Sequence, residues 1–250
     1  MNYNIYFSPT GGTKRVADCL VYHLQEEYKP IDLSKEIEPI QLHSDDICLI
    51  SVPSYGGRVP TVNLERIKKI SGNGARAILN CVYGNRHWDD TLTELQDTLE
   101  TLGFVCVAAI AAVAEHSVFR QFGEGRPDEN DKAQLAEFAV KIQHKLDKNE
   151  TGRLELIGNH GIYKDFRGVP FKPEVNESCM SCGLCAKECP ANAIPVDNPN
   201  ITDKEICISC MRCIRNCPVH ARTLNAELMK VLEEKMAPVL SGYKKNYLYL

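Results

Sequence analysis

The C-terminal part of the sequence repeats one spacing of cysteines, in CMSCGLCAKECP at residues 179–190 and in CISCMRCIRNCP at residues 207–218. Both stretches read Cys-x2-Cys-x2-Cys-x3-Cys-Pro, and they hold eight of the 12 cysteines of this 250-residue chain. The sequence opens without the basic and apolar regions of a signal peptide, and its N-terminal part is long enough to bury a core without disulfide bonds. This crowding of cysteines therefore indicates metal binding.

Zinc and disulfide bonds are the alternatives that such a sequence leaves open. A zinc site needs two pairs of ligands, and two runs of four cysteines exceed that. Residues 174–224 resemble bacterial two-cluster ferredoxins, in which the fourth cysteine of each run binds the other 4Fe-4S cluster. The resemblance implies one cluster on Cys179, Cys182, Cys185 and Cys217, and a second on Cys207, Cys210, Cys213 and Cys189.

Residues 1–148 alternate between compact apolar runs and helical patterns, which is typical of an α/β fold with a parallel sheet. Strands are predicted at residues 4–7, 30–33, 47–52, 76–82 and 104–113. Helices are predicted at residues 13–28, 61–70, 90–102 and 131–146. Five strands with intervening helices predict a flavodoxin-like five-stranded parallel sheet of order 2-1-3-4-5.

The first predicted strand runs into the loop SPTGGT at residues 8–13 and then into a helix. Backbone N–H groups, hydroxyls and the positive end of the helix meet there, which suits a phosphate. The loop has neither the lysine of a Walker A motif nor the Gly-x-Gly-x-x-Gly of a dinucleotide fold. It resembles the phosphate loop of flavodoxins, where FMN is held without arginine or lysine. That resemblance implies FMN contacts from Ser8, Thr10, Gly11, Gly12 and Thr13.

Two further loops follow predicted strands at the same edge of the sheet, where open α/β sheets bind their ligands. In flavodoxins the equivalent loops hold the isoalloxazine ring. The implied ring contacts in this sequence are Pro53, Ser54, Tyr55, Gly56, Tyr83, Gly84, Asn85 and Arg86. Tyr55 and Tyr83 are the candidates to stack on the ring, and Arg86 or Arg58 is the candidate to stabilise its reduced anion. The alternative is that these are ordinary tight turns.

Histidine follows the fifth predicted strand, in Glu115-His116-Ser117. An imidazole with a pKa near neutrality is suited to donate a proton to a substrate reduced at the flavin. A histidine at a strand end is also common as a structural group, so the catalytic residues stay unknown. His87 and Trp88 are expected to cap and pack the following helix.

The whole chain resembles the flavodoxin/ferredoxin fusion family of anaerobic bacteria and archaea. The resemblance is carried by the order of the two parts and by the stretches AEHS at 114–117, GRPD at 125–128 and GVPFKP at 168–173. It implies an FMN-binding domain at residues 1–148, a connector at 149–173, and a ferredoxin domain of α+β type with a C-terminal helix at 174–250. The glycines and aromatic residues of the connector predict an ordered segment packed between the domains.

The sequence predicts electron transfer between two 4Fe-4S clusters and FMN, as a carrier or an oxidoreductase. A flavin-dependent reductase of a small molecule is the first alternative, and a flavin-free docking module is the second. We expect a redox partner protein, either a ferredoxin-like carrier or a reductase, since the sequence has no NAD(P) fingerprint. The formal charge of −4 argues against nucleic acid, and short apolar runs argue against a membrane span, so a cytoplasmic protein is expected. The sequence leaves the oligomeric state open.

Overall fold

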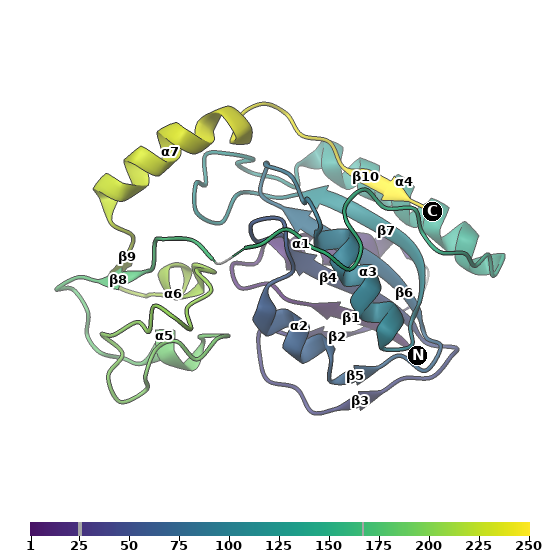
Figure 1. Cartoon of the computed structure of the whole chain (residues 1–250), viewed down its shortest axis with the longest axis horizontal. Helices are drawn as coiled ribbons and strands as arrows, with labels where there is room; N and C mark the ends of the chain where they lie inside the picture. The colour runs from purple at the N-terminus through teal and green to yellow at the C-terminus, as the bar shows by residue number, and fades with distance from the viewer. Residues whose placement is uncertain (25–26, 167) are drawn as a thin grey trace.

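Figure 1 shows the computed structural model of the chain, which describes residues 1–24, 27–166 and 168–250. An α/β domain occupies one side, and the short elements of the ferredoxin segment occupy the other. The elements in chain order are β1 (Asn2–Tyr6), α1 (Gly12–His23), β2 (Tyr28–Asp32), β3 (Ile40–Gln41), β4 (Ile47–Pro53), α2 (Thr61–Ile67), β5 (Ile70–Ser71), β6 (Arg76–Tyr83), α3 (Thr91–Thr101), β7 (Val105–Val113), α4 (Glu129–Asp147), β8 (Glu174–Val175), α5 (Leu184–Lys187), α6 (Arg212–Arg215), β9 (Arg222–Thr223), α7 (Ala226–Leu240) and β10 (Tyr247–Tyr249).

The large sheet has the strand order β10-β7-β6-β4-β1-β2 within the described residues. The strands β2, β1, β4, β6 and β7 run parallel to one another in that spatial order. This is the 2-1-3-4-5 order of the flavodoxin-like fold, so the predicted fold class is confirmed. The carboxyl ends of the parallel strands meet at one edge of the sheet, and the loops that follow them form a shared surface.

The sheet is buried on both faces, which explains the continuous apolar runs of its strands. Alternate residues of β4 belong to different cores, with Cys48 and Ile50 in the core under α3 and Leu49 in the core under α1 and α4. Cys81 and Cys106 also lie in the first core. These thiols therefore act as small buried apolar groups.

Helix α1 is shorter than the sequence predicted. The predicted helix covered residues 13–28, but Tyr28 begins β2 and pairs with Asn2 of β1. Residues 25 and 26 of that prediction lie outside the described residues. Tyr28 is buried, and a residue on the inner face of a helix would be buried too. Apolar periodicity alone therefore could not locate the end of α1.

The last strand, β10, extends the sheet of the N-terminal domain and pairs antiparallel with β7. Asn246 holds β10 in place through its side chain. The side chain accepts a hydrogen bond from the Val113 N–H at 2.8 Å and donates to Asp131 at 2.9 Å and to Gln134 at 2.8 Å. The five-stranded prediction is thus corrected, because β10 covers an edge that β7 would otherwise expose. The tail of the segment predicted as residues 174–250 returns to the first domain (Figure 1).

The ferredoxin segment repeats one backbone conformation in its two halves. Gly183 and Met211 occupy the same position after the second cysteine of each run and have φ angles of 73° and 64°. Ser181 and Ser209, two residues earlier, have φ angles of 51° and 52°. β8 and β9 join the halves as a short antiparallel pair. Met211 thus adopts a left-handed conformation with a side chain, at the position where the first half has glycine.

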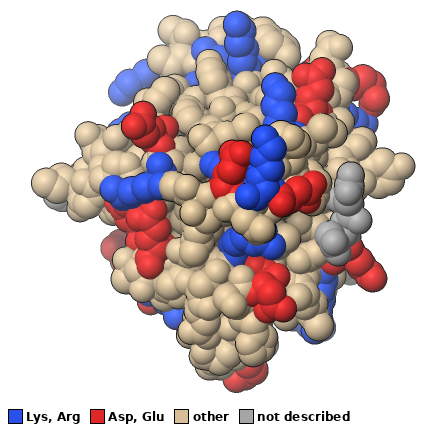
Figure 2. All heavy atoms as spheres, turned by 90° about the vertical axis from the view of Figure 1, so that its right-hand side faces the viewer, with Lys and Arg blue, Asp and Glu red and all other residues tan. Residues whose placement is uncertain are grey.

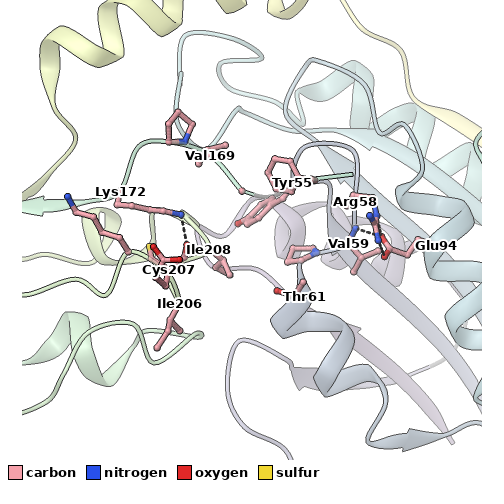
Figure 3. Close-up of a pocket in the computed structure, with 16 residues that line it drawn as sticks. Tyr55, Arg58, Val59, Thr61, Glu94, Val169, Lys172, Ile206, Cys207 and Ile208 are labelled. Atoms are coloured by element: carbon pink, nitrogen blue, oxygen red, sulfur yellow. Dashed lines mark hydrogen bonds and ion pairs between the residues drawn. The ribbon is translucent and has the colours of Figure 1, made fainter. Parts of the chain in front are cut away.

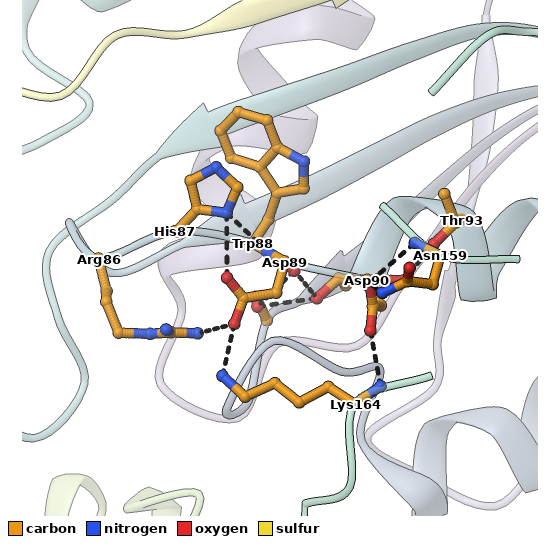
Figure 4. Close-up of polar contacts among 10 residues, drawn as sticks. Arg86, His87, Trp88, Asp89, Asp90, Thr93, Asn159 and Lys164 are labelled. Carbon is orange, nitrogen blue, oxygen red and sulfur yellow. Dashed lines mark hydrogen bonds and ion pairs between the residues drawn. The ribbon is translucent and has the colours of Figure 1, made fainter. Parts of the chain in front are cut away.

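Two carboxylates before α3 hold the connector in place (Figure 4). Asp90 accepts the backbone N–H groups of Asn159 at 2.9 Å and of Lys164 at 2.6 Å. Asp89 accepts the side chains of Lys164 at 2.7 Å and of Arg86 at 2.6 Å. Burial alone would raise the pKa of Asp89, but the hydrogen bonds from Lys164 and Arg86 lower it to about 2. Asp89 is therefore ionised at neutral pH and pairs with both cations.

Replacing Asp90 with alanine is expected to release the connector. The two backbone N–H groups would lose a charged acceptor, which is expected to lower the free energy of unfolding by about 2–4 kcal/mol. Limited proteolysis should then cut between residues 158 and 164 much faster than in the wild type. The exposed Asp45→Ala is the matched control. Equal cleavage in both variants would contradict this role of Asp90.

Positive and negative side chains are interspersed on the face of the molecule in Figure 2, the face turned away from the ferredoxin segment. Among the described residues, we find no helix with both the length and the apolar character needed to cross a bilayer.

Candidate functional site

The cysteines of the two runs form two groups, each around its own small cavity. The outer cluster site consists of Cys179, Cys182, Cys185 and Cys217. The inner cluster site consists of Cys189, Cys207, Cys210 and Cys213. In each group the fourth cysteine comes from the other run, which is the exchange that the ferredoxin resemblance implies. Each group supplies four free thiols, the donor set that a 4Fe-4S cluster requires.

Backbone amides donate to sulfurs of both sites in a repeated pattern. The donors lie two residues after the first cysteine and four residues after the last cysteine of each run. The contacts are Ser181 N–H to Cys179 at 3.4 Å, Ala193 N–H to Cys189 at 3.3 Å, Ser209 N–H to Cys207 at 3.4 Å and Ala221 N–H to Cys217 at 3.2 Å. Hydrogen bonds to ligand sulfurs are one of the means by which a protein sets cluster potential.

The inner cluster site faces the loops of the N-terminal domain. Ile208 and Ser209, which stand between the ligands Cys207 and Cys210, line a cavity of about 390 Å³ among those loops. We name it the loop cavity. Tyr55 lines it as well, and burial, followed by the charge of the Cys210 thiolate, raises the pKa of Tyr55 well above its ordinary value. Tyr55 therefore lies close to both the loop cavity and the inner cluster site.

A larger cavity of about 590 Å³ lies between the two parts of the chain and also borders Tyr55 and Ile208 (Figure 3). Cys207 lines it from the inner cluster site, and Arg58 lines it from the N-terminal domain. Lys172 of the connector donates to the backbone oxygen of Cys207 at 2.6 Å. The connector is thus bonded directly to the backbone of a cluster ligand.

A third cavity, of about 200 Å³, opens at the loop between β1 and α1, and we name it the helix cavity. Thr10 and Gly12 line it. Gly11 has a φ of 90° and forms the N-cap of α1, where positive φ favours glycine. Ser8 accepts a hydrogen bond from a backbone N–H in the first turn of α1 at 2.9 Å, and Thr13 is buried. Two of the five predicted phosphate residues therefore face the cavity, and three shape the loop.

Basic side chains surround the helix cavity from both parts of the chain. Arg15 and Arg120 line it from the N-terminal domain, while Arg215 and His220 line it from the ferredoxin segment. Arg120 is paired with Glu115 at 2.6 Å. The flavodoxin resemblance implied a phosphate loop without arginine, whereas here Arg15 and Arg120 of the N-terminal domain line the cavity, and the ferredoxin segment adds Arg215 and His220.

The loop cavity brings together most of the predicted ring residues. Ser54, Tyr55 and Gly56 line it from the loop after β4, and Gly84 and Arg86 line it from the loop after β6. Sequence reasoning missed the residues that close it from other elements, namely Ser117, Val118, Phe119, Phe166, Val169, Pro170, Phe171, Ile208, Ser209, Leu232 and Met236. The aromatic residues of the connector and the family-like stretches at residues 114–117 and 168–173 were the signals for some of them. Pro53 is buried at the end of β4 and does not line the cavity.

Two glycines allow the walls of the loop cavity to approach one another. A Cβ atom on Gly56 would come within 2.2 Å of the Phe166 ring, and the φ of Gly56 is 61°. A Cβ atom on Gly84 would come within 2.9 Å of the His116 ring. Non-bonded carbon atoms essentially never come this close in a folded protein, so a larger residue at either position would force its neighbour to shift.

Tyr83 and Asn85 do not reach the loop cavity, which corrects their predicted contact with the ring. Tyr83 is 3% exposed, packs against Trp88 and donates its hydroxyl to the backbone oxygen of Lys245 at 2.6 Å. Asn85 donates from its side chain to the backbone oxygens of Leu240 at 2.5 Å and of Gly242 at 2.9 Å. Both side chains bind the C-terminal tail, which the sequence had assigned to the ferredoxin domain.

The two candidate arginines have different positions. Arg86 lines the loop cavity and is paired with Asp89 at 2.6 Å. Arg58 does not line the loop cavity; it is paired with Glu94 at 2.5 Å and donates to the backbone oxygen of Lys164 at 2.6 Å. Of the two arginines, Arg86 is thus the one that lines the loop cavity, and Arg58 holds the connector.

His116 lines the loop cavity as a neutral imidazole. Burial, followed by the positive charge of Arg86, lowers its pKa to about 4. Its Nδ1 atom accepts the backbone N–H groups of Val118 at 3.2 Å and of Phe119 at 3.1 Å, so the ring proton is on Nε2. The hypothesis of a proton donor with a near-neutral pKa is therefore corrected: at neutral pH His116 acts as a hydrogen-bond donor.

Replacing His116 with asparagine is expected to remove a pH-dependent part of the stability. The pKa lies below the ordinary value of 6.5, so the unfolded chain binds the proton more readily. The stabilisation is present above pH 6.5 and declines as the pH falls toward 4, by about 3 kcal/mol in total. Anaerobic urea unfolding at about pH 7 and about pH 5 measures the difference. An equal fall in the variant and the wild type would contradict it, and the exposed His43→Asn is the control.

Comparison with known proteins identifies the C-terminal segment. The family described as the 4Fe-4S binding domain matches residues 173–194 and residues 201–223, one match for each cysteine run. No curated protein sequence matches the chain significantly. The ferredoxin segment therefore carries two 4Fe-4S clusters.

Solved flavodoxins are similar to the N-terminal part. A flavodoxin of Streptococcus pneumoniae TIGR4 is 17% identical, with a TM-score of 0.42 over 58% of this chain and 98% of that one. A flavodoxin of Fusobacterium nucleatum bound to flavin mononucleotide is 13% identical, with a TM-score of 0.41 over 58% and 98% of the two chains. Rubredoxin oxygen:oxidoreductase of Desulfovibrio gigas is 15% identical, with a TM-score of 0.43 over 59% and 36%. The fold assignment itself rests on the strand order of the sheet.

The class of the protein follows from these two parts. A flavodoxin-like sheet and a two-cluster 4Fe-4S segment are joined in one chain, and the inner cluster site faces the ligand edge of the sheet. The protein is an iron–sulfur protein of the electron-transfer class.

Proposed function

We propose that the protein binds FMN at the loop edge of its sheet and transfers electrons between that flavin and the two 4Fe-4S clusters. One observation carries the proposal: the helix cavity and the loop cavity share Ser117 as a wall. Together they extend from the N-terminal end of α1 to residues that stand between two ligands of the inner cluster site. A phosphate suits the first end, and an aromatic ring suits the second.

The residues present offer FMN suitable polar and apolar contacts. To a phosphate group, the helix cavity offers Thr10 and the backbone at Gly12 at the positive end of α1, and it is also lined by Arg215. The loop cavity offers aromatic and apolar walls with Arg86 and the Nε2–H of His116 as polar contacts. Its volume of about 390 Å³ lies within the range of ligand pockets.

Each part of the chain has a distinct task in this proposal. Bound FMN supplies a centre that exchanges one or two electrons. Arg86 lies where a positive charge favours a negatively charged ring, and Leu232 and Met236 of α7 cover the loop cavity and limit access of water. Ile208 lines both the cavity of the inner cluster site and the loop cavity, and Tyr55 lines the loop cavity next to it.

A redox partner protein is proposed to exchange electrons at the outer cluster site. Cys182 is exposed there, and Met180 and Leu184 beside it are 64% and 37% exposed. Apolar residues around a solvent-facing cluster suit a transient contact with a carrier such as a ferredoxin.

Anaerobic purification with counts of iron and flavin tests the proposal. We expect two clusters and one FMN for each chain, and FMN binding at micromolar or lower concentration after removal of flavin. Riboflavin, which has no phosphate, should bind much more weakly, and Gly56→Leu should bind neither flavin because its side chain would collide with Phe166. A protein that contains its iron but binds no flavin would overturn the proposal and leave the docking module as the function.

Reduction of a small molecule is a second candidate, and the shape of the loop cavity favours it. Phe119, Phe166 and Phe171 line the cavity together with the polar groups Arg86 and His116, as in a pocket that orients an apolar ligand. If a substrate accepts a hydrogen bond from His116, its reduction by the flavin should slow in His116→Ala while reduction of the flavin by the clusters is unchanged. Equal substrate reduction in both proteins would remove His116 from that reaction.

A further inference from the structure

Arg66 is a buried arginine at the boundary between the two parts of the chain. It lies on α2 and is 4% exposed. Its guanidinium donates to the backbone oxygen of Leu33 at 2.8 Å and to that of Pro190 at 2.7 Å. Leu33 belongs to the N-terminal domain and Pro190 to the ferredoxin segment, so one side chain joins the two parts.

The contact places the guanidinium beside a cluster ligand. Pro190 directly follows Cys189, and both line the cavity enclosed by the inner cluster site. Arg212 lines this cavity too, but its charge is matched by Glu188 at 2.5 Å. Arg66 is therefore a positive group of the N-terminal domain that contacts the inner cluster site, through the backbone oxygen of Pro190.

The charge of Arg66 is incompletely balanced. Its carboxylate partner is Glu36, at 2.9 Å, and the side chain of Glu36 is 65% exposed. Glu36 is also paired with Lys69 at 3.0 Å. The Nε–H of Arg66 is buried and has no hydrogen-bond partner among the residues that the structure describes. Water screens the exposed carboxylate more than the buried guanidinium, so a net positive field remains at the inner cluster site.

We propose that Arg66 is a positioning residue that raises the reduction potential of the inner 4Fe-4S cluster and holds this cluster against the N-terminal domain. Reduction adds one electron to the cluster and makes it more negative, with no bond formed or broken. Arg66 contacts Pro190, the residue that follows the ligand Cys189, and a buried positive charge at this place stabilises the reduced state of the cluster. The inner cluster becomes the preferred location of an electron that enters at the outer site. This inference rests on the 4Fe-4S clusters and needs no property of a bound flavin.

An anaerobic redox titration of the full chain, followed by absorbance and electron paramagnetic resonance, tests the proposal. The two clusters give two one-electron steps. In Arg66→Met we expect one step to move to lower potential by about 59 mV, which is a tenfold change in the equilibrium constant. The other step should stay in place. Lys68→Met is the matched control, since it removes a positive charge at the end of the same helix. The side chain of Lys68 is paired with Glu65 and is 55% exposed.

Two further variants separate the charge from the fold. Arg66→Lys keeps the charge but loses the two-pronged contact with Leu33 and Pro190, so we expect a smaller shift in potential than in Arg66→Met. Glu36→Gln removes the exposed carboxylate and should move the same step in the opposite direction, to higher potential. Glu36 lies at the surface, so Glu36→Gln should assemble its clusters even if Arg66→Met does not. This variant therefore still tests the direction of the shift in reduction potential. Unchanged potentials in Arg66→Met, or a shift equal to that of Lys68→Met, would overturn the proposal, as would a fall in Glu36→Gln.

Discussion

Replacing Cys189 with alanine is expected to destroy the inner cluster and to stop the clusters from reducing a bound flavin. Cys189 comes from the first cysteine run, yet it lies with Cys207, Cys210 and Cys213 of the second run. Loss of one of four ligands should halve the iron content of the chain. Because the inner site is the one next to the loop cavity, flavin reduction by a one-electron donor should slow by at least roughly a hundredfold.

Cys217→Ala is the matched control, because it removes the equivalent ligand of the outer cluster site. Iron content should fall by the same half, but the inner cluster remains beside the loop cavity. A small artificial donor that reaches the inner cluster should therefore still reduce the flavin. Equal loss of flavin reduction in both variants would contradict the order outer cluster, inner cluster, flavin. Loss confined to Cys217→Ala would reverse that order.

Replacing Asn246 with alanine is expected to detach the C-terminal strand from the sheet. The side chain is 5% exposed and forms hydrogen bonds with Val113, Asp131 and Gln134. Its removal leaves the Val113 N–H without an acceptor in a buried place. The expected loss in the free energy of unfolding is about 2–4 kcal/mol. Thermal unfolding of the anaerobic protein measures it.

The same variant should weaken the cover of the loop cavity. α7 connects the ferredoxin segment to β10, and Leu232 and Met236 of α7 line the loop cavity. A detached tail frees one end of α7, so bound flavin should dissociate faster. Lys245→Ala, a change of the exposed side chain next to Asn246, is the control and should alter neither quantity. Faster flavin loss without a change in stability, or the reverse, would separate the two roles assigned to this strand.

Some parts of the site could be predicted because they depend on local spacing. A 4Fe-4S cluster needs four thiolates at short separations, so the two cysteine runs indicate their chemistry without the rest of the chain. The strand-to-helix loop at residues 8–13 and the loop after β4 are equally local. Among the FMN contacts that the flavodoxin resemblance implied there, Thr10, Gly12, Ser54, Tyr55 and Gly56 line the two cavities.

Other parts could not be predicted because they depend on which segments meet. Tyr83 and Asn85 follow a strand at the ligand edge, as ring contacts would, but their side chains bind the C-terminal tail. The short run Tyr247–Tyr249 is too brief for its alternating pattern to identify a partner strand. A contact across more than a hundred residues leaves no periodic signal in either segment.

The amino-acid sequence alone determined the parallel sheet, its loop edge and the two cluster segments, because apolar periodicity and cysteine spacing are properties of neighbouring residues. The tertiary structure decided which cluster faces the loops, what covers the loop cavity, and that Arg66 joins the two parts. It also decided the neutral state of His116, because burial and the nearby charge of Arg86 lower its pKa to about 4. Burial and charge proximity depend on distances between segments, and these exist once the chain has folded.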